Sequence, residues 1–233
     1  GIAASALLRP NPIASTETAA EPLFRELSGA LEHVADALEA RDPGMAERAL
    51  EEARDLDRSL QEFRNALELA EESVGFVPPY RRMRLAIGRW RDADRPLEFA
   101  MRNVRVLARG AVRVIELDPQ PPAALAIAVR ELASAVRAVQ RNLQGDQERE
   151  QSSVAIVRAA GLANLLVEGG ATMPVSSILA QVRSAATDLL EALGLDHAIA
   201  VTQVRQAARE LKREDHTASA HASGRFASAT PLR

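Results

Sequence analysis

The feature that most constrains the fold is an apolar seam whose members alternate between steps of three and four residues. The seam consists of Ala49, Ala53, Leu56, Leu60, Phe63, Leu67, Ala70 and Val74. Nearly every residue between these positions is charged or polar. This spacing keeps one apolar stripe facing a partner helix over several turns. The segment therefore predicts a long amphipathic helix packed along a second helix.

Proline and glycine residues separate this helix from its neighbours. The first predicted helix begins near Thr18 and has an apolar seam that runs to Leu38. The others run from Pro43 to Val74, from Tyr80 to Leu117, over 125–143, over 147–167, over 175–193 and from His197 to Arg213. Asp42 is placed to cap the second helix, with Pro43 at its first position, so the first two helices form an antiparallel hairpin with almost no loop. Residues 11–18 are predicted to be a linker, and Pro22 is expected in the first turn of the helix that follows. Pro96 is expected to kink or split the third helix, and Asp94 is then placed to cap the second half of that helix.

These patterns predict an all-α fold, an antiparallel helical bundle of about six to seven helices with a long N-terminal helical hairpin. The low aromatic content of 3% and the abundance of alanine agree with helix and disfavour sheet. The same patterns divide the chain into three regions. Residues 1–12 form the end of a membrane helix or a linker, residues 13–213 form the bundle, and residues 214–233, which lack periodicity, form a disordered tail.

The composition excludes several kinds of chemistry. The chain has no cysteine, which rules out disulfides, thiolate metal sites and a cysteine nucleophile. Its net charge of -3 is too small to attract nucleic acid or a membrane in bulk. Arginines gather in the third predicted helix and acidic residues in the second. Because aromatic residues that stack on bases are nearly absent, these two charged helices are predicted to pair with each other.

Residues that could support metal binding or catalysis lack the necessary spacing. The four histidines include no helical pair at positions i and i+4. Glu51, Asp55 and Glu62 share a helix but lack the Glu-x-x-His pairs of di-metal bundles. Glu51, Asp55 and Arg58 are therefore predicted to form a solvated, ion-paired helix face. We predict no catalytic residue, no metal and no cofactor, and hence a protein that is not an enzyme.

One group of polar residues interrupts otherwise apolar helix faces. It consists of Arg102, Asn103, Gln181, Arg183 and Asp188. Because buried polar groups must find partners, we predict a network between these two helices, joined by an Arg102–Asp188 pair or centred on Arg183. Its expected role is to fix the register of the helices.

Three segments together resemble one known protein family. They are residues 1–12 (GIAASALLRPNP), residues 99–114 (FAMRNVRVLARGAVRV) and residues 178–196 (ILAQVRSAATDLLEALGLD). Their order and spacing are similar to the helical region that follows the membrane half of FUSC-type proteins, the fusaric acid resistance or aromatic acid exporter family, in the style of its actinobacterial members. The resemblance covers roughly residues 1–196 of the chain.

The resemblance implies the cytoplasmic domain of an inner-membrane exporter-like protein for small organic or aromatic acids, with a role in assembly or gating. It implies attachment to the cell inner membrane through a preceding N-terminal region, and homo-oligomers formed through the membrane part or the helix faces. The apolar residues 1–8 are too few for a span of about 20 residues, so they are either the end of a membrane helix or an unstructured terminus. The residues alone leave open a free-standing, PhoU-like helical scaffold or regulatory interaction protein. No nucleic-acid partner is expected.

Overall fold

The computed structural model describes residues 11–74, 81–118 and 120–227, and of residues 214–227 it describes the backbone alone. Within these ranges the chain forms seven helices and no strand, which confirms the predicted all-α fold. The helices are α1 (Pro12–Ala40), α2 (Pro43–Val74), α3 (Arg81–Leu117), α4 (Ala123–Gln144), α5 (Arg149–Glu168), α6 (Met173–Ala192) and α7 (His197–Ala227).

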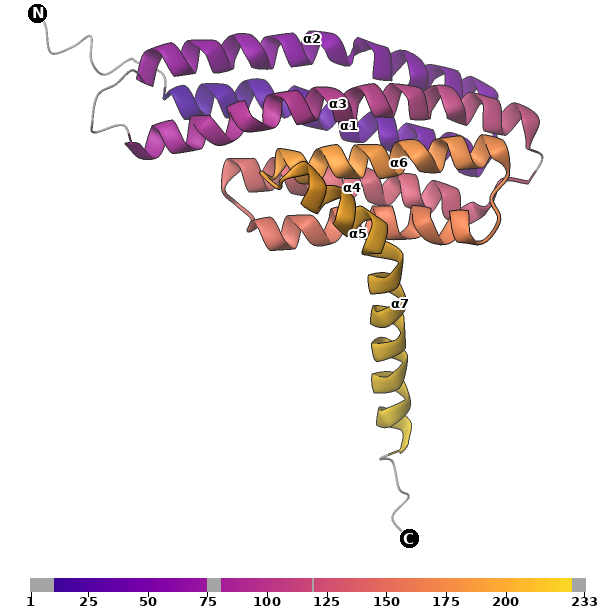
Figure 1. Cartoon of the computed structure of the whole chain (residues 1–233). Coiled ribbons are helices and arrows are strands. Elements are labelled where there is room, and N and C mark those ends of the chain that lie inside the picture. Colours follow the sequence, from indigo (N-terminus) through magenta and orange to yellow (C-terminus); the bar gives the residue numbers. More distant parts are fainter. Residues whose placement is uncertain (1–10, 75–80, 119, 228–233) are drawn as a thin grey trace, which may run out of the picture.

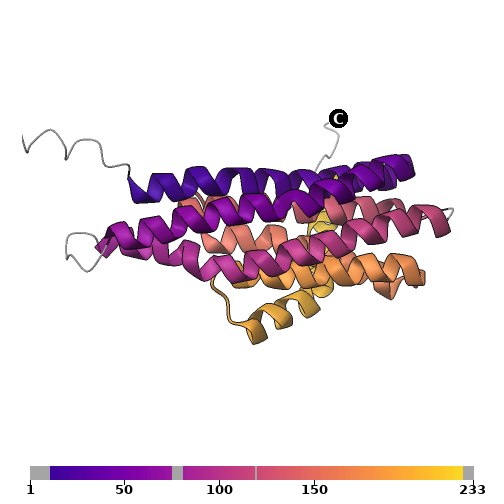
Figure 2. The ribbon, with the colours of Figure 1, turned by 90° about the horizontal axis from the view of Figure 1, so that it is seen from above.

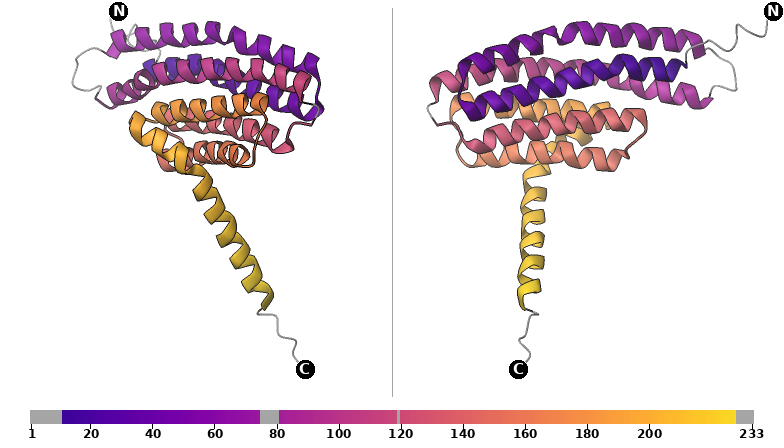
Figure 3. Two further views of the ribbon diagram at one scale, coloured as in Figure 1. Left: turned by 45° about the vertical axis from the view of Figure 1, so that its right-hand side comes forward. Right: turned by 180° about the vertical axis from the view of Figure 1, so that it is seen from behind.

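Six of the helices form two three-helix units that are stacked on each other (Figure 1). The long helices α1, α2 and α3 make one unit, and the shorter α4, α5 and α6 make the other. The units meet where α1 packs on α4 and where α3 packs on α6. Seen from above, the axes of α1, α2, α3 and α6 run nearly along one direction (Figure 2). An oblique view and a view from behind show the same two layers (Figure 3).

The N-terminal hairpin forms as predicted. Arg41 adopts the left-handed conformation, with φ 54° and ψ 39°, and reverses the chain between α1 and α2. Asp42 then caps α2, because its Oδ1 accepts hydrogen bonds from the backbone N–H of Gly44 at 2.8 Å and of Met45 at 3.1 Å. All eight residues of the apolar seam from Ala49 to Val74 are buried.

Helix α1 begins earlier than predicted. The expected start was near Thr18, with a linker before it, but the helix starts at Pro12. Asn11 is the reason, because its side-chain oxygen accepts a hydrogen bond from the N–H of Ile13 at 3.1 Å, and proline is well suited to the first helical position. Pro22 therefore lies in the interior of α1 and not in its first turn.

Of the two predicted effects of Pro96, a kink or a split, the split does not occur, because α3 runs unbroken from Arg81 to Leu117. Arg64 of α2 holds the two sides of the proline together. Its Nε donates to Asp94 Oδ1 at 2.7 Å and its Nη2 donates to Glu98 Oε2 at 2.7 Å. Asp94 thus binds a neighbouring helix and does not cap a second half of α3. The tertiary contacts override the loss of one backbone hydrogen bond at Pro96.

Three aromatic rings join the long helices in the core. Trp90 of α3 is fully buried, with its ring centroid 6.1 Å from that of Phe24 of α1 and 5.8 Å from that of Phe63 of α2. The Phe24 and Trp90 planes cross at 70°, an edge-to-face arrangement that aromatic pairs favour. The cluster therefore ties all three helices of one unit at a single point.

Helix α7 packs on α5 and α6 and then leaves the bundle (Figure 1). The approach to α5 is close at Gly161, where an added Cβ would lie 2.9 Å from the carbonyl oxygen of Ala207 and 2.5 Å from Leu211 Cδ1. Asn164 Nδ2 also donates to the carbonyl oxygen of Val204 at 2.6 Å. Helix α7 was predicted to end at Arg213, but its backbone stays helical to Ala227. Residues 214–227 are therefore not an irregular tail. Residues 228–233 and 1–10 lie outside the described ranges, and with them most of the predicted membrane-helix end or linker.

Candidate functional site

A hollow lies between α1 and α2, and two polar contacts between these helices bracket it. Ser59 is buried, and its hydroxyl donates to Glu26 Oε2 at 2.5 Å. Seven residues away on both helices, His33 Nδ1 lies 2.5 Å from Glu52 Oε2. Because seven residues are almost exactly two helical turns, both contacts lie on the same side of the hairpin.

Small side chains open a groove between the two contacts. Gly29 has no side chain, and nothing lies within 4 Å of the position that a Cβ would occupy there. Ala30 lies beside it and is buried. The resulting groove has a volume of about 590 Å³. That size is within the usual range of ligand pockets, roughly 300–1,000 Å³.

Charged side chains line this groove. It contains four carboxylates and two guanidinium groups, together with His33. The lining residues are Pro22, Arg25, Glu26, Gly29, Ala30, His33, Glu52, Asp55, Arg58, Ser59 and Glu62. The charge balance is negative, so the groove, which we call the α1–α2 groove, favours cationic groups.

The predicted polar network between α3 and α6 is reduced to one hydrogen bond. Asn103 Nδ2 donates to Asp188 Oδ2 at 2.6 Å. The predicted Arg102–Asp188 pair is wrong, because Arg102 pairs with Glu98 one turn away on its own helix. Its guanidinium carbon also lies 5.6 Å from the centre of the Phe99 ring. Gln181 and Arg183 take no part in the Asn103–Asp188 contact.

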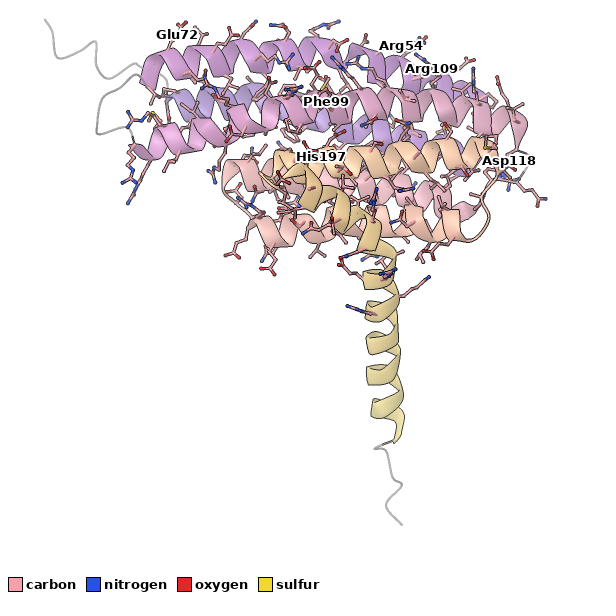
Figure 4. All side chains as sticks on the ribbon, viewed as in Figure 1. Arg54, Glu72, Phe99, Arg109, Asp118 and His197 are labelled. Carbon is pink, nitrogen blue, oxygen red and sulfur yellow. The ribbon has the colours of Figure 1, made fainter. Side chains whose placement is uncertain are left out.

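Burial gives Asp188 an unusual titration. Desolvation raises its pKa to about 7, against the lowering effect of the hydrogen bond from Asn103. The charge of Glu191 raises this pKa further, whereas His197 lowers it. His197 lies at the start of α7 (Figure 4), with Nδ1 at 2.6 Å from Glu191 Oε1, and this contact raises the pKa of the imidazole. Asp188 is therefore a half-buried acid that changes charge near neutral pH.

This titration predicts a pH-dependent effect of Asp188→Asn. Because the pKa is higher in the folded protein than the ordinary value of 3.8, the stabilising effect of protonation is complete below that value and is lost as the pH rises through about 7. The amide cannot ionise and can still accept from Asn103. We expect the variant to be more stable than the wild type by about 1 kcal/mol at pH 8, after discounting for solvent screening, with a smaller difference at pH 5.

Urea denaturation at both pH values measures this difference. Asp92→Asn, at an exposed position of α3, is the matched control for removing one negative charge. An Asp188→Asn variant whose stability relative to the wild type is equal at pH 5 and pH 8 would contradict the assignment.

The predicted pairing of the second and third helices occurs at two positions. Asp57 pairs with Arg105 and Glu71 pairs with Arg91. Between these two pairs lies the reverse arrangement, in which Arg64 of α2 binds two acids of α3. We call these four ion pairs the α2–α3 ladder. Its three steps, Asp57–Arg105, Arg64–Glu98 and Glu71–Arg91, are seven residues apart on both helices.

Sequence reasoning missed the residues that frame the α1–α2 groove. The sequence alone assigns no role to His33, Glu26 or Ser59. One signal was available, since Glu26 and His33 on α1, like Glu52 and Ser59 on α2, are seven residues apart and fall on one face of each helix. Within the described parts of the chain, no group of three or more histidine or acidic side chains is placed to hold a metal ion.

Comparison with known proteins adds no identification, because no family model, curated protein or solved structure matches the chain. Among the helices that the structure describes, none combines the length and the apolar character that a membrane crossing requires.

Proposed function

We propose that this chain is a helical interaction module that binds cationic side chains of a partner protein in the α1–α2 groove. The observation that carries the proposal is the groove itself, a charged hollow of about 590 Å³ on a rigid helical hairpin. This is the scaffold or regulatory role that the sequence left open, with a specific surface assigned to it.

The charges of the groove support a cationic partner. Glu26 and Glu52 are held in place by Ser59 and His33 respectively. The second carboxylate oxygen of Glu26 lies 3.6 Å from Arg25 Nη2, whereas that of Glu52 lies outside the His33 contact. Asp55 lies on α2 between Glu52 and Ser59 and is exposed. Contrary to the predicted ion-paired face of Glu51, Asp55 and Arg58, it has no ion pair within 4 Å among the described residues. Lysine and arginine side chains of a partner helix would meet carboxylates along about 10 Å of groove, the rise of seven helical residues.

Filling the groove tests the proposal without changing its charges. Gly29→Phe places a ring in the open space above Gly29, and phenylalanine is no worse a helix former than glycine. We expect the affinity for a fluorescent hexa-arginine peptide, measured by anisotropy at low salt, to fall at least about tenfold.

Gly88 of α3 provides the matched control. It is also a glycine inside a helix, with nothing within 4 Å of an added Cβ, but it lies outside the groove. Gly88→Phe should therefore bind the peptide as the wild type does. Equal affinity of the Gly29→Phe variant and the wild type would refute the groove as the binding surface.

A second proposal is that this bundle is the cytoplasmic domain of an inner-membrane exporter-like protein for small organic or aromatic acids, acting in assembly or gating. One observation favours it: two of the three segments that carry the resemblance, residues 99–114 and 178–196, pack against each other through α3 and α6. The test is the natural reading frame upstream of Gly1. Several apolar stretches of about 20 residues each would support the proposal, and a start codon near Gly1 would contradict it.

Homo-oligomerisation through helix faces is a further part of the second proposal. Light scattering on the purified chain measures it directly. A strictly monomeric chain at all concentrations would restrict any self-association to regions outside this sequence.

A further inference from the structure

A separate pocket between α6 and α7 is lined by two arginines and by no acidic residue. Its volume is about 280 Å³. The lining residues are Ala180, Arg183, Ser184 and Thr187 of α6, and Val201, Val204 and Arg205 of α7. The positions on each helix fall on one face, which is why the two sets meet where α7 crosses α6 (Figure 1).

Arg183 lacks the partner that its position requires. Its Nε is buried and has no hydrogen-bond partner. A buried donor without a partner is costly, and more so when it carries charge. Within the described part of the chain, no carboxylate lies within 4 Å of either Arg183 or Arg205.

The other interhelical arginines of the bundle behave differently. Arg64 binds Asp94 and Glu98, Arg130 binds Asp36 and Glu39, and Arg137 binds Glu32. These arginines satisfy their donors with acids of a neighbouring helix. The two arginines of the α6–α7 pocket have no such acidic partner among the described residues and line a common hollow.

The remaining lining residues suit a small anion with an apolar part. Ser184 brings a hydroxyl group, whereas the hydroxyl of Thr187 is already used, because its Oγ1 donates to the carbonyl oxygen of Arg183 at 3.1 Å. Ala180, Val201 and Val204 supply an apolar wall. The nearest acid along α6, Asp188, is bonded to Asn103 of α3 and so does not neutralise the pocket.

The wall contributed by α7 is held in a defined position. Asn164 of α5 binds the carbonyl oxygen of Val204, a residue of the pocket. Gly161 lets α7 approach α5 closely one turn further on. The pocket is therefore built from fixed helices and not from a loop.

We propose that the α6–α7 pocket binds an oxyanion, a carboxylate or phosphate group, carried by a small compound. The forked guanidinium of arginine pairs with two oxygens of such a group. The volume of about 280 Å³ holds more than a bare ion, since water occupies about 30 Å³ per molecule. This inference is independent of the α1–α2 groove.

The test titrates sodium acetate and, separately, inorganic phosphate into the purified chain at constant ionic strength. The readout is the ¹⁵N-edited NMR signal of the arginine Nε–Hε groups, which reports a change in the surroundings of each guanidinium group. We expect the Arg183 signal to shift saturably with one of the two anions. A carboxylate source is indicated if acetate saturates first, and a phosphorylated source if phosphate does.

Substitutions locate the binding. Arg183→Gln and Arg205→Gln should each weaken the preferred anion at least about tenfold, because each removes charge-assisted hydrogen bonds. Arg209→Gln removes the same charge from an exposed position of α7 outside the pocket and should leave the affinity unchanged. Circular dichroism confirms that each variant is folded.

The proposal is overturned by either of two results. One is a wild-type Arg183 signal that moves with neither anion beyond the shift caused by sodium chloride. The other is an equal loss of affinity in the Arg205→Gln and Arg209→Gln variants, which would show a general charge effect.

Discussion

Replacing Trp90 with alanine should lower the free energy of unfolding by about 3–5 kcal/mol, the usual cost of removing a large buried aromatic side chain. Trp90 is fully buried, and its ring contacts Phe24 of α1 and Phe63 of α2. The cavity would open where three long helices meet, and helices cannot close it without shifting their axes. Urea denaturation followed by circular dichroism measures the loss.

Trp90→Phe is the control that separates volume from hydrogen bonding. The indole Nε1 is buried and has no hydrogen-bond partner, so phenylalanine removes a donor that is costly to bury. We expect this variant to lose only about 1 kcal/mol, because the smaller ring leaves a small cavity. A Trp90→Phe variant as unstable as Trp90→Ala would show that the indole group has a partner after all.

The second large effect is expected at Gly161. An alanine Cβ there would lie 2.9 Å from the carbonyl oxygen of Ala207, and a backbone atom cannot move aside as a side chain can. Helix α7 must therefore shift away from α5, at a cost of about 1–3 kcal/mol. Hydrogen exchange should report this as faster exchange in α7 than in α1–α3.

The same substitution at Gly29 should have the opposite sign. Nothing lies within 4 Å of an added Cβ at Gly29, and alanine favours a helix interior over glycine by roughly 0.5–1 kcal/mol. Gly29→Ala is thus expected to stabilise the fold. If Gly161→Ala were also neutral or stabilising, α7 would not be held as closely as described.

The helices could be predicted from the sequence where an apolar seam is regular and clear caps bound it. The seam from Ala49 to Val74 and the cap at Asp42 fixed α2 correctly at both ends. The start of α1 was missed because Asn11 and Pro12 were weighed as linker residues, although they are also a cap and a first helical residue. The continuity of α3 across Pro96 was not predictable, because it depends on Arg64, more than 25 residues away in the chain.

The polar contacts were harder to predict than the helices. Two residues of the predicted network, Asn103 and Asp188, do meet, since both lie on faces that point toward the other helix. Arg102 was expected to pair with Asp188. Because it precedes Asn103 on α3, it lies on a different face of that helix, where it pairs with Glu98. The α1–α2 groove depends on the missing side chain at Gly29. The α6–α7 pocket depends on the lack of an acidic side chain beside Arg183 among the described residues. Periodicity identifies the residues that pack but not the spaces that they leave.

The α2–α3 ladder has a consequence for how the chain finds one alignment of its helices. An apolar seam that repeats every seven residues would pack almost as well if α2 slid along α3 by one repeat. The α2–α3 ladder would not pair after such a slide. Its middle step has the basic residue on α2 and the acidic residues on α3, which is the reverse of the two outer steps. Sliding one way would set Arg64 against Arg91 and Asp57 against Glu98, and sliding the other way would set Arg64 against Arg105 and Glu71 against Glu98. Two like-charged contacts would replace attractive ones in either misaligned state. The reversed pairing at Arg64 therefore destabilises the shifted alignments of α2 and α3 that the apolar seam alone would tolerate.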